Sequence, residues 1–257
     1  MITQVLALCG AILVSAPGQA GQGHDHFVHG DSVVVQGATV STWARVNGAG
    51  KVTWVGVTMP ASLADQLPPP GSGPAGAFAV LSFPPIVRNT TYFNHVELGA
   101  NPHGHATNPA FAQPGRYSAA HFDIHYYAVP VAQVFSIPPG LFFTPAPANL
   151  LPAGWAQPEP FSVPQMGRHA GLLTEFTATD HWLATMVAGF LPNASSMHFI
   201  EPMITQELLV SRKNFTLPVP VPASLGWSTR YPSEFVAQYN HKKDTYDFIF
   251  KGFGQMH

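Results

Sequence analysis

The most regular hydrophobic pattern in the chain is an alternation of polar and large apolar side chains over residues 121–127. Successive side chains of a β-strand point to opposite faces, so this pattern predicts a strand with two different faces. The polar face carries three side chains that are able to bind a metal: His121, Asp123 and His125. The apolar face carries three large side chains that we expect in a core: Phe122, Ile124 and Tyr126.

Further segments rich in Val, Thr and aromatic residues predict strands elsewhere in the chain. Residues 32–46 and 52–59 flank Asn47-Gly48-Ala49-Gly50, which is typical of a hairpin turn. The other predicted strands cover residues 78–83, 92–98, 182–190, 197–200 and 246–250. A single short and partly amphipathic helix is predicted at residues 201–212.

The composition supports a fold built on strands and turns. The chain has 257 residues and contains 26 Pro and 23 Gly, which shorten helices and favour turns. Hydrophobic residues make up 46% and charged residues only 9%, so we expect a large core. Pro-rich passages at residues 68–74 and 138–164 predict exposed loops. The expected fold is mainly β: a single sandwich or barrel-like domain with one short helix and long Pro-rich loops.

The N-terminal segment has the pattern of a secretory signal. An apolar run from Val5 to Val14 is followed by small residues that end in Gly18-Gln19-Ala20. This pattern predicts a signal peptide at residues 1–20, a flexible His-rich segment at 21–30 and one β-rich domain at 31–257. The apolar run is too short for a stable transmembrane anchor. We therefore expect a periplasmic or secreted protein.

Cysteine chemistry is excluded from the mature chain that this signal implies. Cys9 is the only cysteine and lies within the apolar run. Its removal would leave no disulfide, no thiolate nucleophile and no cysteine ligand for zinc. Any metal site must then be built from histidines and carboxylates, which suit Zn, Fe, Mn or Cu and do not distinguish among them.

The charge pattern argues against a nucleic-acid partner. The net charge is -2, and the 11 Lys and Arg residues are scattered. Only Arg212-Lys213 and Lys242-Lys243 place two basic residues side by side. Such a surface cannot neutralise a phosphate backbone, so we expect no nucleic-acid binding. The apolar composition is compatible with a homo-oligomer, and no motif identifies a small-molecule ligand.

Strand geometry limits which polar residues can share one metal ion. Residues two apart on a strand lie about 6.6 Å apart, and residues four apart lie about 13 Å apart. His121 with Asp123, or Asp123 with His125, can therefore bind the same ion. His121 and His125 together would need a bulge or a strong twist. The histidine left over would lie behind the metal ligands or serve as an acid/base group.

The remaining ligands must come from distant parts of the chain. His169 follows a glycine, and Glu201 is expected at the end of a strand. His105 and His103 lie in a turn-rich segment and form a second tier of candidates. One arrangement adds His169 to the H-x-D pair, in the order used by two-His-one-carboxylate iron sites. The other combines several histidines with Glu201, as in cupin-like barrels.

Five short motifs follow one another over roughly half of the chain: N-H-V-E-L at 94–98, N-P-H-G-H at 101–105, H-F-D-I-H-Y-Y at 121–127, M-G-R-H at 166–169 and E-P-M-I-T at 201–205. In this order they resemble a family of mostly exported bacterial proteins of unknown function, typified by a sigma-E-controlled Thermus protein. The resemblance implies a β-rich fold and a shared polar site. The residues it implies for that site are His105, His121, Asp123, His125, His169 and Glu201. It implies no activity.

Two hypotheses follow from these patterns. The first is an exported metalloprotein with a divalent ion on a β scaffold, which would be a metal-dependent enzyme if a coordination position is open. The second is a non-catalytic envelope-stress or ligand-binding protein. In that case the polar cluster buffers metal, or Asp123 pairs with histidines across strands in a buried ladder.

Overall fold

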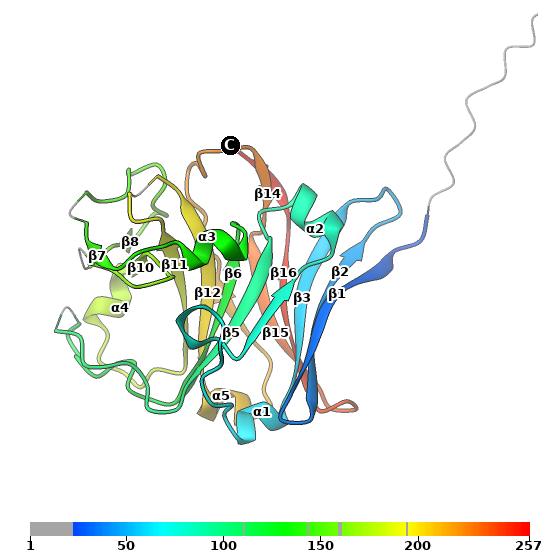
Figure 1. Cartoon of the computed structure of the whole chain (residues 1–257), viewed down its shortest axis with the longest axis horizontal. Coiled ribbons are helices and arrows are strands. Elements are labelled where there is room, and N and C mark those ends of the chain that lie inside the picture. Colours follow the sequence, from blue (N-terminus) through cyan, green and yellow to red (C-terminus); the bar gives the residue numbers. More distant parts are fainter. Residues whose placement is uncertain (1–22, 110, 143, 159–160, 194) are drawn as a thin grey trace, which may run out of the picture.

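Two antiparallel β-sheets pack face to face in the computed structural model, which describes residues 23–109, 111–142, 144–158, 161–193 and 195–257 (Figure 1). One sheet has six strands and the other has seven. The predicted mainly β sandwich is therefore confirmed. The signal-peptide prediction falls on residues that lie outside this description. Every helix in the described ranges is too short or too polar to be a candidate membrane span.

The six-stranded sheet consists, in spatial order, of β1 (His26–Val35), β2 (Ala38–Val46), β3 (Val52–Pro60), β16 (Thr245–Lys251), β15 (Glu234–Asn240) and β13 (Phe215–Pro218). Each strand pairs antiparallel with its neighbours. The predicted turn at Asn47 joins β2 to β3, where the Asn47 side chain accepts hydrogen bonds from the amides of Ala49 and Lys51.

The N-terminal strand begins earlier than the sequence pattern predicts. Residues 26–29 pair with residues 43–46, and the Phe27 ring lies 5.4 Å from the ring of Trp43. The segment predicted as a flexible tail therefore joins the sheet from His26 onward, because β2 offers it both backbone partners and an aromatic contact. Gln36 and Gly37 both have positive φ angles, 49° and 80°. Such a pair favours a tight hairpin turn, which divides the single strand predicted at 32–46 into β1 and β2.

The seven-stranded sheet consists, in spatial order, of β4 (Ala79–Ser82), β5 (His95–Asn101), β6 (His121–Tyr127), β12 (Met197–Thr205), β11 (Ala184–Phe190), β10 (Arg168–Leu172) and β8 (Trp155–Ala156). Strand β6 lies between β5 and β12, and all of its residues are buried. The strand with the clearest alternation in the sequence thus occupies the middle region of this sheet.

The apolar face of β6 packs into the core between the two sheets. Phe122, Ile124 and Tyr126 are fully buried there, as their alternation predicts. The Tyr126 ring lies 4.7 Å from the Phe250 ring of the opposite sheet, and its hydroxyl donates a 2.9 Å hydrogen bond to the Phe248 carbonyl. Because the hydroxyl is satisfied, burying tyrosine here leaves no unpaired donor. The opposite face of β6 consequently points away from the core.

The helices are short and connect strands. They are α1 (Ser62–Asp65), α2 (Pro85–Thr90), α3 (Val131–Phe135), α4 (Leu173–Thr177) and α5 (Gln206–Val210), with a 3₁₀ turn, η1 (Pro74–Gly76). The helix predicted at residues 201–212 is wrong in its first half, because β12 continues through that half to Thr205. The Thr205 hydroxyl then caps α5 by accepting a 3.3 Å hydrogen bond from the Leu208 amide. Glu201 therefore lies within a strand.

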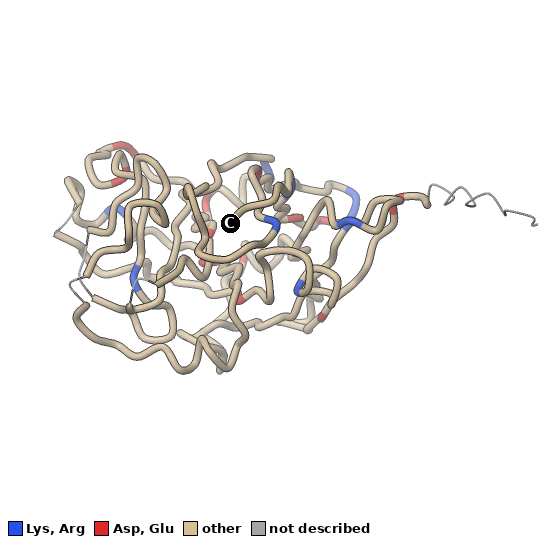
Figure 2. The backbone as a smooth tube through the Cα atoms, turned by 90° about the horizontal axis from the view of Figure 1, so that it is seen from above, with Lys and Arg blue, Asp and Glu red and all other residues tan. Residues whose placement is uncertain are grey.

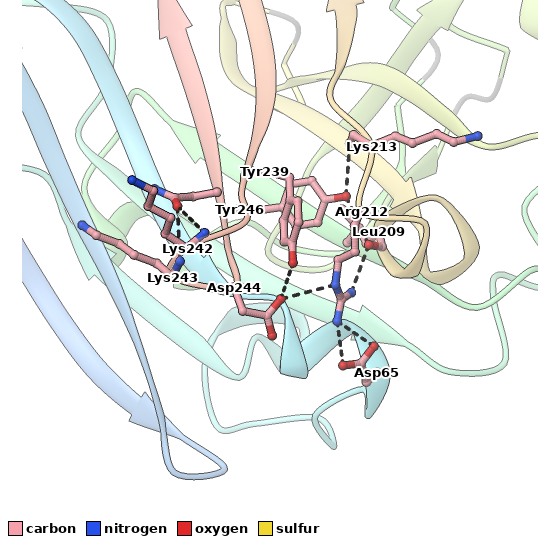
Figure 3. A network of polar contacts seen from close by, with 10 residues as sticks. Asp65, Leu209, Arg212, Lys213, Tyr239, Lys242, Lys243, Asp244 and Tyr246 are labelled. Atoms are coloured by element: carbon pink, nitrogen blue, oxygen red, sulfur yellow. Dashed lines mark hydrogen bonds and ion pairs between the residues drawn. The ribbon is translucent and has the colours of Figure 1, made fainter.

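Charged residues are few and spread along the molecule (Figure 2). One group of them closes an end of the sandwich beside α1 and α5 (Figure 3). The Arg212 guanidinium donates to both carboxylate oxygens of Asp65, at 2.9 and 2.7 Å, and lies 3.4 Å from Asp244. The Tyr239 hydroxyl donates a 2.7 Å hydrogen bond to the same Asp244. This network joins α1, the end of α5 and the β15–β16 turn.

The outer face of the seven-stranded sheet is covered by long connections (Figure 1). They are the described residues between β5 and β6 (102–109 and 111–120) and, apart from β8, the described residues between β6 and β10 (128–142, 144–158 and 161–167). The second connection contains α3 and the paired two-residue strands β7 (Gly140–Leu141) and β9 (Phe161–Ser162). A further short pair, β14 (Thr229–Tyr231) with β17 (Gly254–Met256), lies near the C-terminus. The covering connections enclose the polar face of β6.

Candidate metal site

Polar side chains gather on the outer face of the seven-stranded sheet. The sheet register places Glu97 opposite His125 and Asn101 opposite His121. Farther along the sheet, Glu201 lies opposite Val187, and His169 lies opposite Gly189. Since side chains alternate between faces, the residues that share the face of Asp123 are His95, Glu97, Asn101, His121, His125, His169 and Glu201. Four strands thus contribute to one polar surface.

Two of these side chains, together with one from a covering loop, come close enough to share a metal ion. His105, His121 and Asp123 each offer one ligand atom, and those atoms all lie within 4.8 Å of one another. The Nε2 atom of His121 is 3.1 Å from Oδ1 of Asp123, and Nε2 of His105 is 3.7 Å from Oδ2. The two imidazole rings are 4.7 Å apart. We call this group the His105 cluster.

His121 is held in a fixed orientation. Its Nδ1 atom lies 2.7 Å from the Ala119 carbonyl, to which it donates a hydrogen bond in the neutral ring. The edge of the Trp182 ring system packs against the imidazole at 5.1 Å. A histidine that donates from one ring nitrogen to a carbonyl presents the lone pair of the other nitrogen to a metal. The second nitrogen of His121, Nε2, points toward Asp123.

His105 reaches the cluster from the loop that follows β5. Its backbone amide donates a 2.8 Å hydrogen bond to the Tyr117 carbonyl, which fixes the loop across the face of the sheet. Gly104 precedes it with a φ of 64°, and a Cβ atom there would collide with the backbone of Ser118. Only glycine fits this close approach without strain. The His105 side chain is 45% exposed, so this ligand faces the open side of the cluster.

Asn101 links the two ligands contributed by β6. Its amide nitrogen donates a short hydrogen bond to Oδ2 of Asp123 and lies 3.4 Å from Nε2 of His121. We did not predict this role. The signal for it is present, because His95, Glu97 and Asn101 continue one period-2 polar face along β5.

The ionisation of the carboxyl groups follows from their neighbours. Burial disfavours the charge on Asp123, but the hydrogen bond and the charge of His121, with the charge of His105, outweigh it and lower the pKa of Asp123 to about 2. Burial and the nearby Asp123 carboxylate raise the pKa of Glu201 well above its ordinary value. Asp123 is therefore the anionic ligand, and Glu201 holds its proton beside it.

The other predicted ligands lie on the same face but outside the His105 cluster. Nε2 of His125 is 3.4 Å from Oε1 of Glu201, and burial lowers the pKa of His125 to about 4. The His169 ring packs against Phe199 at 5.6 Å, and burial lowers its pKa to about 3. His103 is exposed in the turn after β5. The third ligand position, which we predicted for His169 in the H-x-D arrangement, is therefore occupied by His105, a second-tier candidate.

A second histidine–carboxylate pair is buried on β5. Nε2 of His95 lies 3.1 Å from Oε1 of Glu97, and the His95 ring stacks on Tyr127 at 5.0 Å. Burial raises the pKa of Glu97, and the hydrogen bond and charge of His95 offset part of that rise. The sheet therefore holds a second buried contact between a histidine and a carboxyl group, in addition to the His105 cluster.

A cavity of about 700 Å³ borders the His105 cluster. His105, Asp123, His169 and Glu201 contribute its polar side. The rest of the lining includes side chains from the covering loops, from α4 and from β11 and β12. A ligand in this cavity would therefore reach two members of the cluster directly.

No family model matches the chain, and neither the curated proteins nor the solved structures contain a match to it. Two imidazoles and one carboxylate form the ligand set of many Zn and non-haem Fe centres. Three protein ligands leave coordination positions for water or a substrate, and the adjoining cavity provides space for either.

Proposed function

We propose that this chain is an exported metalloprotein in which His105, His121 and Asp123 bind one divalent metal ion at the edge of the cavity. The ion, with its open coordination positions, makes the protein a metal-dependent enzyme that acts on a small molecule. The observation that carries this proposal is the convergence of two imidazole nitrogens and a carboxylate within 4.8 Å, beside a cavity of about 700 Å³. Histidine and carboxylate ligands fit Zn, Fe, Mn or Cu.

The surroundings of the three ligands support a metal site over a chance cluster. Ala119 orients the His121 ring, and Asn101 holds the Asp123 carboxylate, as outer partners do in metal centres. The low pKa of Asp123, about 2, keeps this ligand anionic at neutral pH. The exposed side of His105 leaves a path for the ion to enter from solvent.

Export is part of the same proposal. The apolar run at Val5–Val14 and the small residues before Gly21 have the pattern of a signal peptide. Cys9 would be removed with it, so the mature chain would contain only ligands that tolerate an oxidising compartment. The resemblance of the five motifs to mostly exported bacterial proteins points in the same direction.

One observation favours a second candidate, a non-catalytic protein in which the cluster stabilises the fold. Asp123 already receives a hydrogen bond from Asn101 and lies beside His121, so the charged group has polar partners within the protein itself. The buried His95–Glu97 pair repeats this kind of contact at a distance from the cluster. A polar ladder of this type needs no metal.

Elemental analysis distinguishes the two candidates. Mature protein without a His tag is purified and measured by inductively coupled plasma mass spectrometry, beside His121→Ala, His105→Ala and the matched control His181→Ala. His181 is exposed, and its Nε2 contacts Glu207 rather than a ligand of the cluster. We expect one stoichiometric metal in the wild type and the control, and its loss in the first two variants. A metal-free wild type under replete conditions would overturn the enzyme proposal and leave the structural ladder.

A further inference from the structure

The cavity beside the His105 cluster has a polar end and apolar walls. Its volume of about 700 Å³ lies within the usual range of small-molecule pockets, roughly 300–1,000 Å³. Asp123, His169 and Glu201 lie on the sheet at one end, and His105 extends over it from the loop. A ligand that fills this space would therefore have one end in polar surroundings and the remainder in apolar ones.

Aromatic side chains from two segments form one wall. The Phe111 ring packs edge-on against Tyr117 at 5.2 Å and against Phe176 at 5.0 Å. The contact with Phe176 joins the loop after β5 to α4, which are more than fifty residues apart in the chain. Val187 and Met203, from the sheet, add aliphatic surface to the same cavity. Such walls bind flat or branched apolar groups.

The fixed charges of the cavity do not favour an anion. Arg116 is the one Lys or Arg among the lining residues described, and its guanidinium contacts Glu175 at 3.0 Å and Asp180 at 3.3 Å. Its charge is therefore balanced by two carboxylates. In the protein without metal, an anionic group at the polar end would instead lie beside the negative charge of Asp123. Like charges in such surroundings repel.

We infer that this cavity binds an uncharged, largely apolar small molecule with a single oxygen-bearing head group, such as a phenol, alcohol, aldehyde or ketone. The apolar body lies against Phe111, Phe176 and Val187. The head group lies at the polar end, within reach of the ion that the His105 cluster would hold. The placement of the head group rests on the proposed function, whereas the apolar body depends only on the walls.

Two probes of similar shape test the charge of the ligand. Binding of 1-naphthol and of 1-naphthoate is measured by isothermal titration calorimetry on mature wild-type protein stripped of metal with a chelator, because a bound divalent ion would itself attract the carboxylate. We expect 1-naphthol to bind with a Kd in the micromolar range and 1-naphthoate to bind at least about tenfold more weakly. Equal or tighter binding of the anion would overturn the inference of an uncharged ligand.

Two variants test the location. Gly171 lines the cavity, and a Cβ atom added there meets only Phe176, at an ordinary contact distance of 3.7 Å. Gly171→Phe should therefore fill the cavity from β10 and weaken 1-naphthol binding by about tenfold or more. Phe161→Asp adds a charge at an exposed lining position, so it tests the wall even if the first variant fails to fold. Phe27→Asp, exposed on β1 of the other sheet, is the matched control.

Metal content measured on the same preparations before any chelator treatment separates the two proposals. Naphthol binding that is lost in Gly171→Phe and Phe161→Asp, in a protein that is purified without metal, would support the apolar cavity and overturn the metalloenzyme. A stoichiometric metal together with naphthol binding that neither variant changes would overturn the cavity inference alone. The full inference requires the metal to be retained in both variants while the affinity for 1-naphthol falls.

Discussion

Nε2 of His121 lies 3.1 Å from Oδ1 of Asp123, although two residues on the same face of β6 have backbones much farther apart. The approach is made by the side chains: Ala119 turns the imidazole, and Asn101 turns the carboxylate. The contact raises the pKa of His121 against the opposing effect of burial. The carboxylate and the imidazole are thus held in place by neighbouring groups before any ion binds. A ring nitrogen of His105 completes the set of three possible metal ligands.

Removing the charge of Asp123 should weaken metal binding without changing the shape of the site. Asp123→Asn keeps the side-chain volume but replaces an anionic oxygen ligand with a neutral amide. We expect the affinity for the divalent ion to fall by about a hundredfold or more, since loss of outer partners alone costs about 10–100-fold. Competition with a coloured chelator measures this affinity. Asp25→Asn, at an exposed position on the other side of the sandwich, should leave it unchanged.

Gly104 offers a test of how His105 is positioned. Gly104→Ala introduces a Cβ atom that collides with the Ser118 backbone at a φ of 64°, so the loop must move and carry His105 with it. We expect weaker metal binding and a loss of roughly 1–3 kcal/mol in the free energy of unfolding. Gly37→Ala is the matched control, because its φ is 80° but no atom lies within 4 Å of the added Cβ.

The two glycine variants separate strain from displacement. Both place a side chain in the left-handed region, which costs about 1 kcal/mol in each case. Only the Gly104 variant also displaces a ligand. Equal metal affinity in Gly104→Ala and Gly37→Ala, measured with the same chelator, would show that the position of His105 does not matter for the ion.

The polar face of β6 could be predicted from the sequence because a strand repeats every two residues. The same rule correctly assigned Phe122, Ile124 and Tyr126 to the core. The prediction was wrong at residues 201–205, because every residue of β12 is buried and the strand shows no alternation. A segment that is buried on both faces cannot be distinguished from a short helix by period alone.

The composition of the metal cluster was only partly predictable. His121 and Asp123 are two residues apart on one strand, so their proximity follows from local geometry. His105 comes from a loop whose path over the sheet depends on the Tyr117 carbonyl and on the fit of Gly104 against Ser118. Such long-range contacts leave no periodic signal in the chain. The presence of histidines near a glycine turn therefore identified His105 as a candidate without ranking it first.

Arg212 should contribute measurably to stability through the network in Figure 3. Arg212→Ala removes a bidentate contact with Asp65 and a second ion pair with Asp244. The partners are about half exposed, so solvent screens the pairs, and we expect a loss of about 1 kcal/mol in the free energy of unfolding. Urea unfolding at low and high salt should show a smaller loss at high salt. Arg88→Ala, at an exposed position on α2, should have little effect at either salt concentration.

The buried histidine His198 should make the fold sensitive to acid. It is fully buried on β12, and burial, with the charge of His169, lowers its pKa to about 3, whereas backbone groups of Gly189 and Met166 raise it only in part. Between pH 6.5 and this value the unfolded chain binds a proton that the folded protein does not bind. The contribution of His198 to stability is therefore fully present above about pH 6.5 and is lost as the pH falls toward 3.

The size of this effect can be measured by unfolding metal-free protein in urea at pH 7 and pH 5. His198 alone should lower the free energy of unfolding by about 2 kcal/mol over that interval, since each pH unit below 6.5 costs about 1.4 kcal/mol. His198→Gln retains a polar side chain that does not titrate, so the variant should lose less stability than the wild type between the two pH values. His241→Gln, in the exposed β15–β16 turn, should lose as much as the wild type. Equal losses of unfolding free energy in wild type and His198→Gln between the two pH values would contradict this prediction. They would show that His198 binds its proton equally in the folded and unfolded states.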